Sequence, residues 1–150
     1  MLLLQTEYIA PEKIENIIIQ SLLIGQSFVY GDSLQSSLVA IVVPDEEPLR
    51  NLLASRNGDL ASLSKASLPE ICQNEAIKEV IMKEIHKVAK KNGLHGFEIP
   101  KAICLSPDLF SVENGLLTPT FKLKRQQARD KYAKEIERMY ASMPKLKSKI

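Results

Sequence analysis

The chain is 150 residues long, which suits one domain or one small domain with a long appendage. Its hydrophobic content of 45% and charged content of 25% are ordinary for a soluble globular protein that builds a core without disulfide or metal support. No apolar run approaches the ~18 residues that a membrane-spanning helix needs. The Met1–Leu4 start is too short for a signal peptide and has no positive region before it.

Positive charge is concentrated near the C-terminal end, although the net charge is only +2. Residues 122–149 hold ten Lys/Arg and three Asp/Glu, a local charge of +7, and the rest holds ten and fifteen, a local charge of −5. A basic field of this kind suits a phosphate-bearing partner. A nucleotide, coenzyme A, a nucleic acid and an anionic lipid all fit, and charge alone does not choose among them.

The first predicted elements are a short strand or hairpin arm over Leu2–Ile9 and a helix with Pro11 in its first turn. Three isoleucines at i, i+3 and i+4 form the apolar face of that helix: Ile14, Ile17 and Ile18. Its predicted polar face consists of Glu12, Lys13, Glu15 and Asn16.

A β-hairpin is predicted next, because Gln26–Tyr30 and Leu34–Val43 are rich in β-branched and aromatic residues around a Gly31-Asp32-Ser33 turn. Leu38–Val43 is apolar at nearly every position, which is typical of a central strand covered on both faces. Pro44 ends this strand.

The middle of the chain predicts two helices separated by a loop. Asp45 is the expected cap of the first helix, whose buried stripe is Leu49, Leu52 and Leu53 and which stops at Asn57-Gly58. Asp59–Pro69 has no clear period and is interpreted as a surface loop. Asn74 is the expected cap of the second helix, which stops at Asn92-Gly93. Its apolar face is Ile77, Val80, Ile81, Ile85 and Val88.

The last elements are a short strand over Lys101–Leu105 and a helix from about Lys124 to Tyr140, ended by Pro144 and followed by a basic tail. The predicted inward side chains of that helix are Tyr132, Ile136, Met139 and Tyr140. The order β-α-β-β-α-α-β-α predicts an α+β fold: a small, mainly antiparallel sheet with helices packed on it.

Most catalytic signatures are absent: the sequence has no GxSxG elbow, no P-loop and no GxGxxG. Cys72 and Cys104 stand 32 residues apart without a CxxC motif, and we expect two free, buried thiols in a reducing compartment. His86 and His95 are distant from each other and lack clustered acids or thiols. We therefore expect no metal site.

The stretch that most resembles part of a functional site is Glu113–Arg125. An Asn-Gly turn leads into a predicted extended run that Pro119 stiffens. Three cations then follow within four residues: Lys122, Lys124 and Arg125. This pattern predicts either a lysine on a pre-organised arm that reaches an anionic ligand, or a solvated basic entry to a surface helix.

Two stretches resemble a known family, the eukaryotic-type long-chain fatty acyl-CoA synthetases. Glu7–Asn16 (EYIAPEKIEN) resembles the segment just after the family's interdomain hinge, and Asn114–Arg125 (NGLLTPTFKLKR) looks like its final core motif. Further similar segments lie between them in the same order: Val42–Asp45, Gly93–His95 and Asp108–Val112. The resemblance covers essentially the whole chain.

This resemblance implies the small C-terminal lid domain of an adenylate-forming enzyme over residues 1–150, with the large N-terminal domain absent. In the family, ATP and a fatty acid give an acyl-adenylate, and coenzyme A then gives the thioester and AMP. The large domain holds most of the ATP, Mg²⁺ and fatty-acid sites. We therefore expect little ligase activity from this chain alone, and we expect its partner to be its own N-terminal adenylation domain.

The resemblance also implies roles for individual residues. Lys122 matches the catalytic lysine of adenylation, where an ammonium offsets repulsion between a carboxylate and the α-phosphate. For Lys124 and Arg125, phosphate contact and simple solvation both stay open. Thr6, Glu7 and Tyr8 match the turn that forms the coenzyme A channel in the thioester step, except that the family usually has glycine where Thr6 stands.

Two alternatives stay open: a non-catalytic basic module that binds nucleic acid or an anionic membrane, and an enzyme that adenylates another carboxylic acid. Aromatics make up only 5% of the chain, which disfavours nucleic acid. The expected location is a cytosol-facing membrane, such as the endoplasmic reticulum, with association through another part of the protein. The final Ser148-Lys149-Ile150 differs from a peroxisomal Ser-Lys-Leu signal only in its last residue, so a peroxisomal location is the alternative.

Overall fold

The centre of the molecule is a three-stranded sheet. The structure, a computed structural model, describes residues 2–4, 7–31, 37–56 and 58–142. The sheet has the order β3-β4-β5 and consists of β3 (Ile24–Gly31), β4 (Leu38–Pro44) and β5 (Ala102–Leu105). As predicted, β3 and β4 pair antiparallel, whereas β5 pairs parallel to β4, which the sequence did not indicate. A separate antiparallel hairpin joins β1 (Leu2–Leu4) to β2 (Glu7–Ile9).

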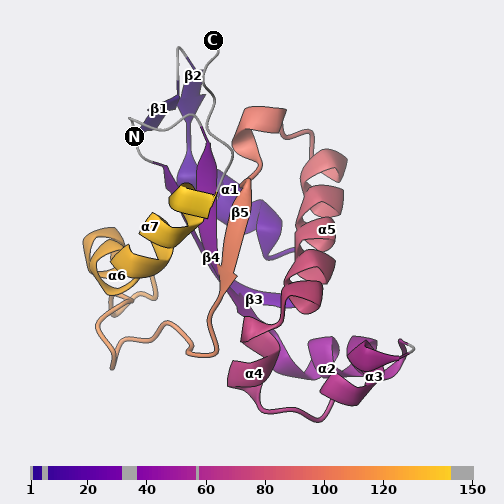
Figure 1. The fold of residues 1–150 in the computed structure, drawn as a ribbon. Coiled ribbons are helices and arrows are strands. Elements are labelled where there is room, and N and C mark those ends of the chain that lie inside the picture. Colours follow the sequence, from indigo (N-terminus) through magenta and orange to yellow (C-terminus); the bar gives the residue numbers. More distant parts are fainter. Residues whose placement is uncertain (1, 5–6, 32–36, 57, 143–150) are drawn as a thin grey trace.

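Helices cover both faces of this sheet (Figure 1). On one face lie α1 (Pro11–Ile18) and α5 (Glu75–Lys91), and on the other α6 (Arg125–Lys131) and α7 (Ala133–Ser142). The segment between β4 and α5 forms α2 (Glu46–Ala54), α3 (Asp59–Leu63) and α4 (Leu68–Gln73). A short 3₁₀ turn, η1 (Gly96–Glu98), precedes β5. The α+β prediction of a small sheet with packed helices is confirmed.

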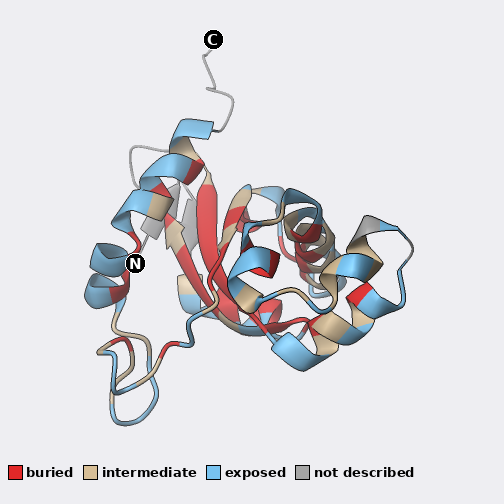
Figure 2. Cartoon of the chain, turned by 60° about the horizontal axis from the view of Figure 1, so that its bottom comes forward, coloured by how far each residue is buried: buried red, intermediate tan, exposed pale blue. Residues whose placement is uncertain are grey.

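Strand β4 is buried along its whole length, because a core packs on each of its faces (Figure 2). Leu38, Ala40 and Val42 face the core beneath α1 and α5. Val39, Ile41 and Val43 face the core beneath α6 and α7. The continuous apolar run of β4 therefore belongs to a central strand that is paired at both edges and covered on both faces, as predicted.

Local signals fix several helix ends. Pro11 is the first residue of α1, and the Asn74 Oδ1 accepts a hydrogen bond of 3.0 Å from the Ile77 amide at the start of α5. Gly93, with φ of 77°, follows the end of α5 in the left-handed conformation that glycine accepts without strain. Asp45 does occupy the N-cap position of α2, but its side chain makes no capping bond there.

The predicted surface loop over Asp59–Pro69 is wrong, since this segment contains α3 and the start of α4. The Ser67 Oγ caps α4 by accepting from the Glu70 amide at 3.3 Å. The Arg50 guanidinium donates to two backbone carbonyls between the two short helices, at 3.0 and 2.6 Å. Tertiary contacts thus stabilise helices too short for a periodic signal.

The single C-terminal helix of the prediction is interrupted at Tyr132, between α6 and α7. Tyr132 is buried with φ of −103°, and its hydroxyl lies 3.2 Å from the Ser106 Oγ. The predicted inward side chains Ile136 and Met139 are buried. Pro144 and the basic tail lie outside the described residues, and in the part described no helix is long and apolar enough to cross a membrane.

Candidate functional site

Lys122 lies on a hairpin that projects between β5 and α6. We call residues 116–124 the lysine hairpin. Its arms are joined by a β-bridge between Leu117 and Leu123 and by a hydrogen bond of 2.7 Å from the Lys124 amide to the Leu116 carbonyl. The Thr118 amide donates to the Lys122 carbonyl at 2.8 Å. This backbone pairing differs from the predicted extended run, because the chain turns back on itself between residues 118 and 121.

The turn of the hairpin is closed by Phe121. Its amide donates to the Thr118 carbonyl at 2.7 Å, and its φ of 65° is left-handed. Glycine usually fills such a position in short hairpins. The Thr118 Oγ1 also accepts from the Lys122 amide at 3.0 Å and lies 3.1 Å from the Thr120 Oγ1. The turn therefore fixes the backbone of the lysine while leaving its side chain exposed.

The arm that leads into the hairpin is tied to the sheet. The side-chain amide of Gln26 on β3 binds both backbone groups of Phe110, accepting from its amide at 2.7 Å and donating to its carbonyl at 3.0 Å. The Asn114 Oδ1 accepts from the amides of Ser111 and Leu116 at 3.0 and 3.1 Å. The predicted Asn-Gly turn is confirmed.

The other end of the hairpin is anchored by an ion pair. The Arg125 guanidinium donates two bonds to the Glu15 carboxylate, at 3.0 and 2.7 Å. The same carboxylate accepts from the Val29 amide of β3 at 2.7 Å. Glu15 is 8% exposed, so its assignment to the polar face of α1 was wrong. Burial raises the pKa of Glu15, against the lowering effect of its bonds to Arg125 and Val29.

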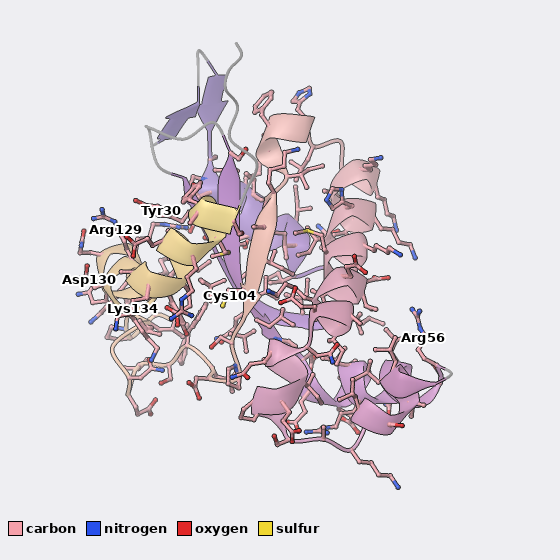
Figure 3. All side chains as sticks on the ribbon, in the orientation of Figure 1. Tyr30, Arg56, Cys104, Arg129, Asp130 and Lys134 are labelled. Carbon is pink, nitrogen blue, oxygen red and sulfur yellow. The ribbon has the colours of Figure 1, made fainter. Side chains whose placement is uncertain are left out.

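Helix α6 is held to β3 at a second point. Figure 3 shows Arg129 beside Tyr30, with its Nε 3.2 Å from the tyrosine hydroxyl and its guanidinium carbon 5.8 Å from the ring centroid. With the Arg125 ion pair, this contact fixes the helix that follows the lysine. The lysine hairpin is therefore a short projection between anchored segments.

The predicted site residues do not converge on one place. In the part of the chain that is described, the Lys122 ammonium makes no ion pair. The half-buried Lys124 is the N-cap residue of α6, and Arg125 forms an ion pair with Glu15. Glu7 and Tyr8 lie on β2, and Thr6 lies outside the described residues. The β1-β2 hairpin and the lysine hairpin stand at opposite ends of the sheet (Figure 1).

A cleft of about 430 Å³ lies between α4, α5, β5 and the α6–α7 pair, away from Lys122. Three acids and three basic side chains line it: Glu75, Asp108, Glu135, Lys78, Lys131 and Arg138. Both free thiols also line it. Burial raises the pKa of Cys72 to about 11 and also raises that of Cys104. Both cysteines are therefore protonated at neutral pH, which does not suit a nucleophile.

Sequence reasoning missed three residues that support the hairpin: Glu15, Gln26 and Thr118. Glu15 lies within the Glu7–Asn16 segment that carries the family resemblance but was given no role of its own, and Gln26 lies in no motif. The available signal for Glu15 was its position in α1 directly after Ile14, at the edge of the apolar face, where a carboxylate becomes buried. The signal for Thr118 was its residue type, because a threonine hydroxyl at the start of a turn can bond to the backbone of that turn.

No protein-family model matches the chain. Among curated proteins, it is 44% identical over 141 residues to long-chain-fatty-acid–CoA ligase 1 of Cavia porcellus and 43% identical over 141 residues to long chain acyl-CoA synthetase 6, peroxisomal, of Arabidopsis thaliana. The chain is homologous to the C-terminal region of the long-chain fatty acid–CoA ligases. Each of these two alignments covers 94% of this chain but only 19% of the relative's length.

Solved structures of related fold come from carboxylate reductases. The adenylation domain of a carboxylate reductase from Mycobacterium chelonae matches with a TM-score of 0.76 and 33% identity, covering 95% of this chain and 19% of that one. The corresponding domain from Segniliparus rugosus, in complex with AMP and a co-purified carboxylic acid, matches with a TM-score of 0.76 and 30% identity, over 96% of this chain and 20% of that one. The chain therefore has a fold found in adenylate-forming enzymes, as the sequence resemblance implied.

Proposed function

We propose that this chain is the C-terminal lid domain of an AMP-forming long-chain fatty acid–CoA ligase, and that Lys122 assists adenylation. The observation that carries the proposal is an exposed lysine on a hairpin fixed at both ends, within a motif that resembles the family's catalytic one. Homology to the ligases supports the fatty-acid substrate. The N-terminal adenylation domain is the proposed partner.

The chemistry follows from the charge of the reacting groups. Adenylation joins a carboxylate to the α-phosphate of ATP, and both are anions. An ammonium between them reduces their repulsion and stabilises charge in the transition state. The exposed Lys122 side chain fits this role because no described carboxylate of the chain neutralises it. Lys124 is a second candidate for phosphate contact, whereas Arg125 must first release Glu15.

Most of the ATP and Mg²⁺ site belongs, in this proposal, to the rest of the enzyme. Among the described residues no group of three or more His, Cys, Asp or Glu side chains is placed to hold a metal ion. Glu7 and Tyr8 of β2 are the proposed elements for the thioester step. Their distance from the lysine hairpin supports a rotation of the domain between the two steps (Figure 1).

The test is Lys122→Ala in the full-length enzyme, with the half-reactions assayed separately. We expect acyl-adenylate formation from ATP and fatty acid to fall about 10²–10³-fold. Thioester formation from supplied acyl-adenylate and coenzyme A should change less than about twofold. Lys134→Ala, which removes the same charge from the exposed side of α7, is the matched control (Figure 3).

Equal effects of Lys122→Ala and Lys134→Ala would refute the proposal and favour a diffuse basic surface that binds nucleic acid or anionic membrane. In that case, affinity should fall a little with each cation removed and depend strongly on salt. Loss confined to adenylation at Lys122 supports the lid domain. Activity with a different carboxylic acid would keep the lid assignment but replace the substrate.

For location, we propose a cytosol-facing membrane, with the association made by another part of the enzyme. Two relatives from Arabidopsis thaliana are named as peroxisomal, which makes the Ser148-Lys149-Ile150 segment a feature to test. Deleting these three residues from the full-length enzyme should leave its location unchanged. Loss of peroxisomal import on deletion would support the peroxisome instead.

A further inference from the structure

Glu15 connects three parts of the molecule that are distant in sequence. Its side chain belongs to α1, accepts from the Val29 amide of β3, and takes both bonds of the Arg125 guanidinium at the start of α6. Three of the four lone-pair directions of a carboxylate are used by these donors. The contact joins residues 110 positions apart.

The position of Arg125 makes this contact relevant to Lys122. Only Leu123 and Lys124 separate the two residues, and both take part in the backbone pairing of the lysine hairpin. The hairpin therefore moves as a unit with its C-terminal end, which Glu15 holds. On the N-terminal side, Leu116 is buried in the core beneath α6 and α7, but the hydrogen bonds to the sheet lie farther away, where the Gln26 side chain binds Phe110.

We infer that Glu15 is a positioning residue for Lys122: by holding Arg125, it fixes where the lysine hairpin stands relative to α1 and β3. This inference rests on the function proposed above. Catalysis by a charged group depends steeply on its placement, and a displacement of about 1 Å can cost about 10²-fold in rate. The two-pronged, charge-assisted bond is directional, and so it resists such a displacement at the C-terminal end of the hairpin.

The buried ion pair is weak evidence for a stabilising role. Burial raises the pKa of Glu15 even though Arg125 and Val29 stabilise the carboxylate, so its ionised form is disfavoured by the folded surroundings. Buried ion pairs of this kind often contribute little to stability. Because the Arg125 side chain is 41% exposed, water can hydrate it when Glu15 is neutralised, and we expect Glu15→Gln to fold.

A matched control exists in Glu98. It is also buried, at 7% exposed, it also accepts a backbone amide bond, from His95 at 2.9 Å, and it also faces a cation, Lys13 at 3.7 Å. It lies in η1, at the end of the sheet opposite the lysine hairpin (Figure 1). Glu98→Gln therefore removes a comparable buried charge without touching the hairpin.

The experiment compares Glu15→Gln, Glu98→Gln and Arg125→Lys in the full-length enzyme, each alone and combined with Lys122→Ala. We expect Glu15→Gln to lower adenylation about 10- to 100-fold while thioester formation from supplied acyl-adenylate changes less than about twofold. Arg125→Lys keeps the positive charge but cannot make the two-pronged bond to Glu15, so we expect a smaller loss of adenylation than with Glu15→Gln. In the Lys122→Ala background, Glu15→Gln should lower adenylation no further, because its effect acts through the lysine.

Hydrogen–deuterium exchange provides a readout independent of activity. The amides of Thr118, Lys122 and Lys124 are bonded within the hairpin and should exchange faster in Glu15→Gln but not in Glu98→Gln. The inference is overturned if Glu15→Gln lowers both half-reactions equally, or if Glu98→Gln lowers adenylation as much. It is also overturned if Glu15→Gln lowers adenylation just as much in the Lys122→Ala background, or if amide exchange in the hairpin is unchanged. If Lys122→Ala itself leaves adenylation intact, the proposed function fails, and the exchange result still decides whether Glu15 fixes the hairpin.

Discussion

Phe121 offers the sharpest test of the hairpin geometry. Its φ of 65° places a residue with a bulky side chain in the left-handed region, which costs about 1–2 kcal/mol for any residue that carries a Cβ. The ring is 73% exposed, so its removal loses little buried surface. Backbone conformation, rather than packing, should therefore dominate substitutions here.

The magnitude follows from a comparison of alanine with glycine. Phe121→Ala keeps the Cβ and so keeps the strain. Phe121→Gly removes the strain of about 1–2 kcal/mol but gives the unfolded chain extra freedom of about 0.5–1 kcal/mol. We expect Phe121→Gly to be more stable than Phe121→Ala by about 0.5–1 kcal/mol.

The control site is Lys83, which is exposed in the middle of α5. In a right-handed helix, glycine is less stable than alanine by about 1 kcal/mol. The sign of the glycine-minus-alanine difference should therefore reverse between Lys83 and Phe121. Because both pairs compare the same two residue types, the reversal isolates backbone conformation.

The assay is urea unfolding of the four variants, followed by circular dichroism, with thermal melts in parallel. A difference of 1 kcal/mol corresponds to about 2–4 °C in Tm for a protein of this size. If glycine is the less stable residue at both sites, Phe121 does not adopt the left-handed conformation. The tight turn that presents Lys122 would then be refuted with it.

Three further predictions concern stability and reactivity. Asn74→Ala should lower the free energy of unfolding by about 1 kcal/mol in the same urea titration, because its side chain caps α5, and no change would contradict that cap. Cys72 should react with iodoacetamide at pH 8 about a hundredfold more slowly than in urea, since burial raises its pKa to about 11; equal labelling rates by mass spectrometry would contradict this. Burial lowers the pKa of His86 below its ordinary value of 6.5, and the positive charges of Lys101 and Lys90 lower it further. Because the unfolded chain then binds the proton more readily, the free energy of unfolding should decrease as the pH drops from 6.5 through the lowered pKa. His86→Gln should flatten this part of the pH–stability curve, and an unchanged curve would exclude His86 as its source.

Elements with strong local signals were predictable. The β3–β4 hairpin follows from two β-rich runs around a turn, and α5 from its cap, apolar face and glycine stop. The short helices α3 and α4 were not predictable, because segments of five and six residues show no period and depend on contacts such as those of Arg50. The break at Tyr132 likewise accompanies burial of one side chain rather than a helix-breaking residue.

The sequence by itself determined the α+β class, the doubly covered central strand and the motif around Lys122, because each depends on residues adjacent in the chain. Only the tertiary structure decided how that lysine is held. Glu15 looks like a surface residue of α1 until Arg125, 110 positions later, lies against it. A buried charge is recognisable only once its partner is known, since folding, not local sequence, brings the two together.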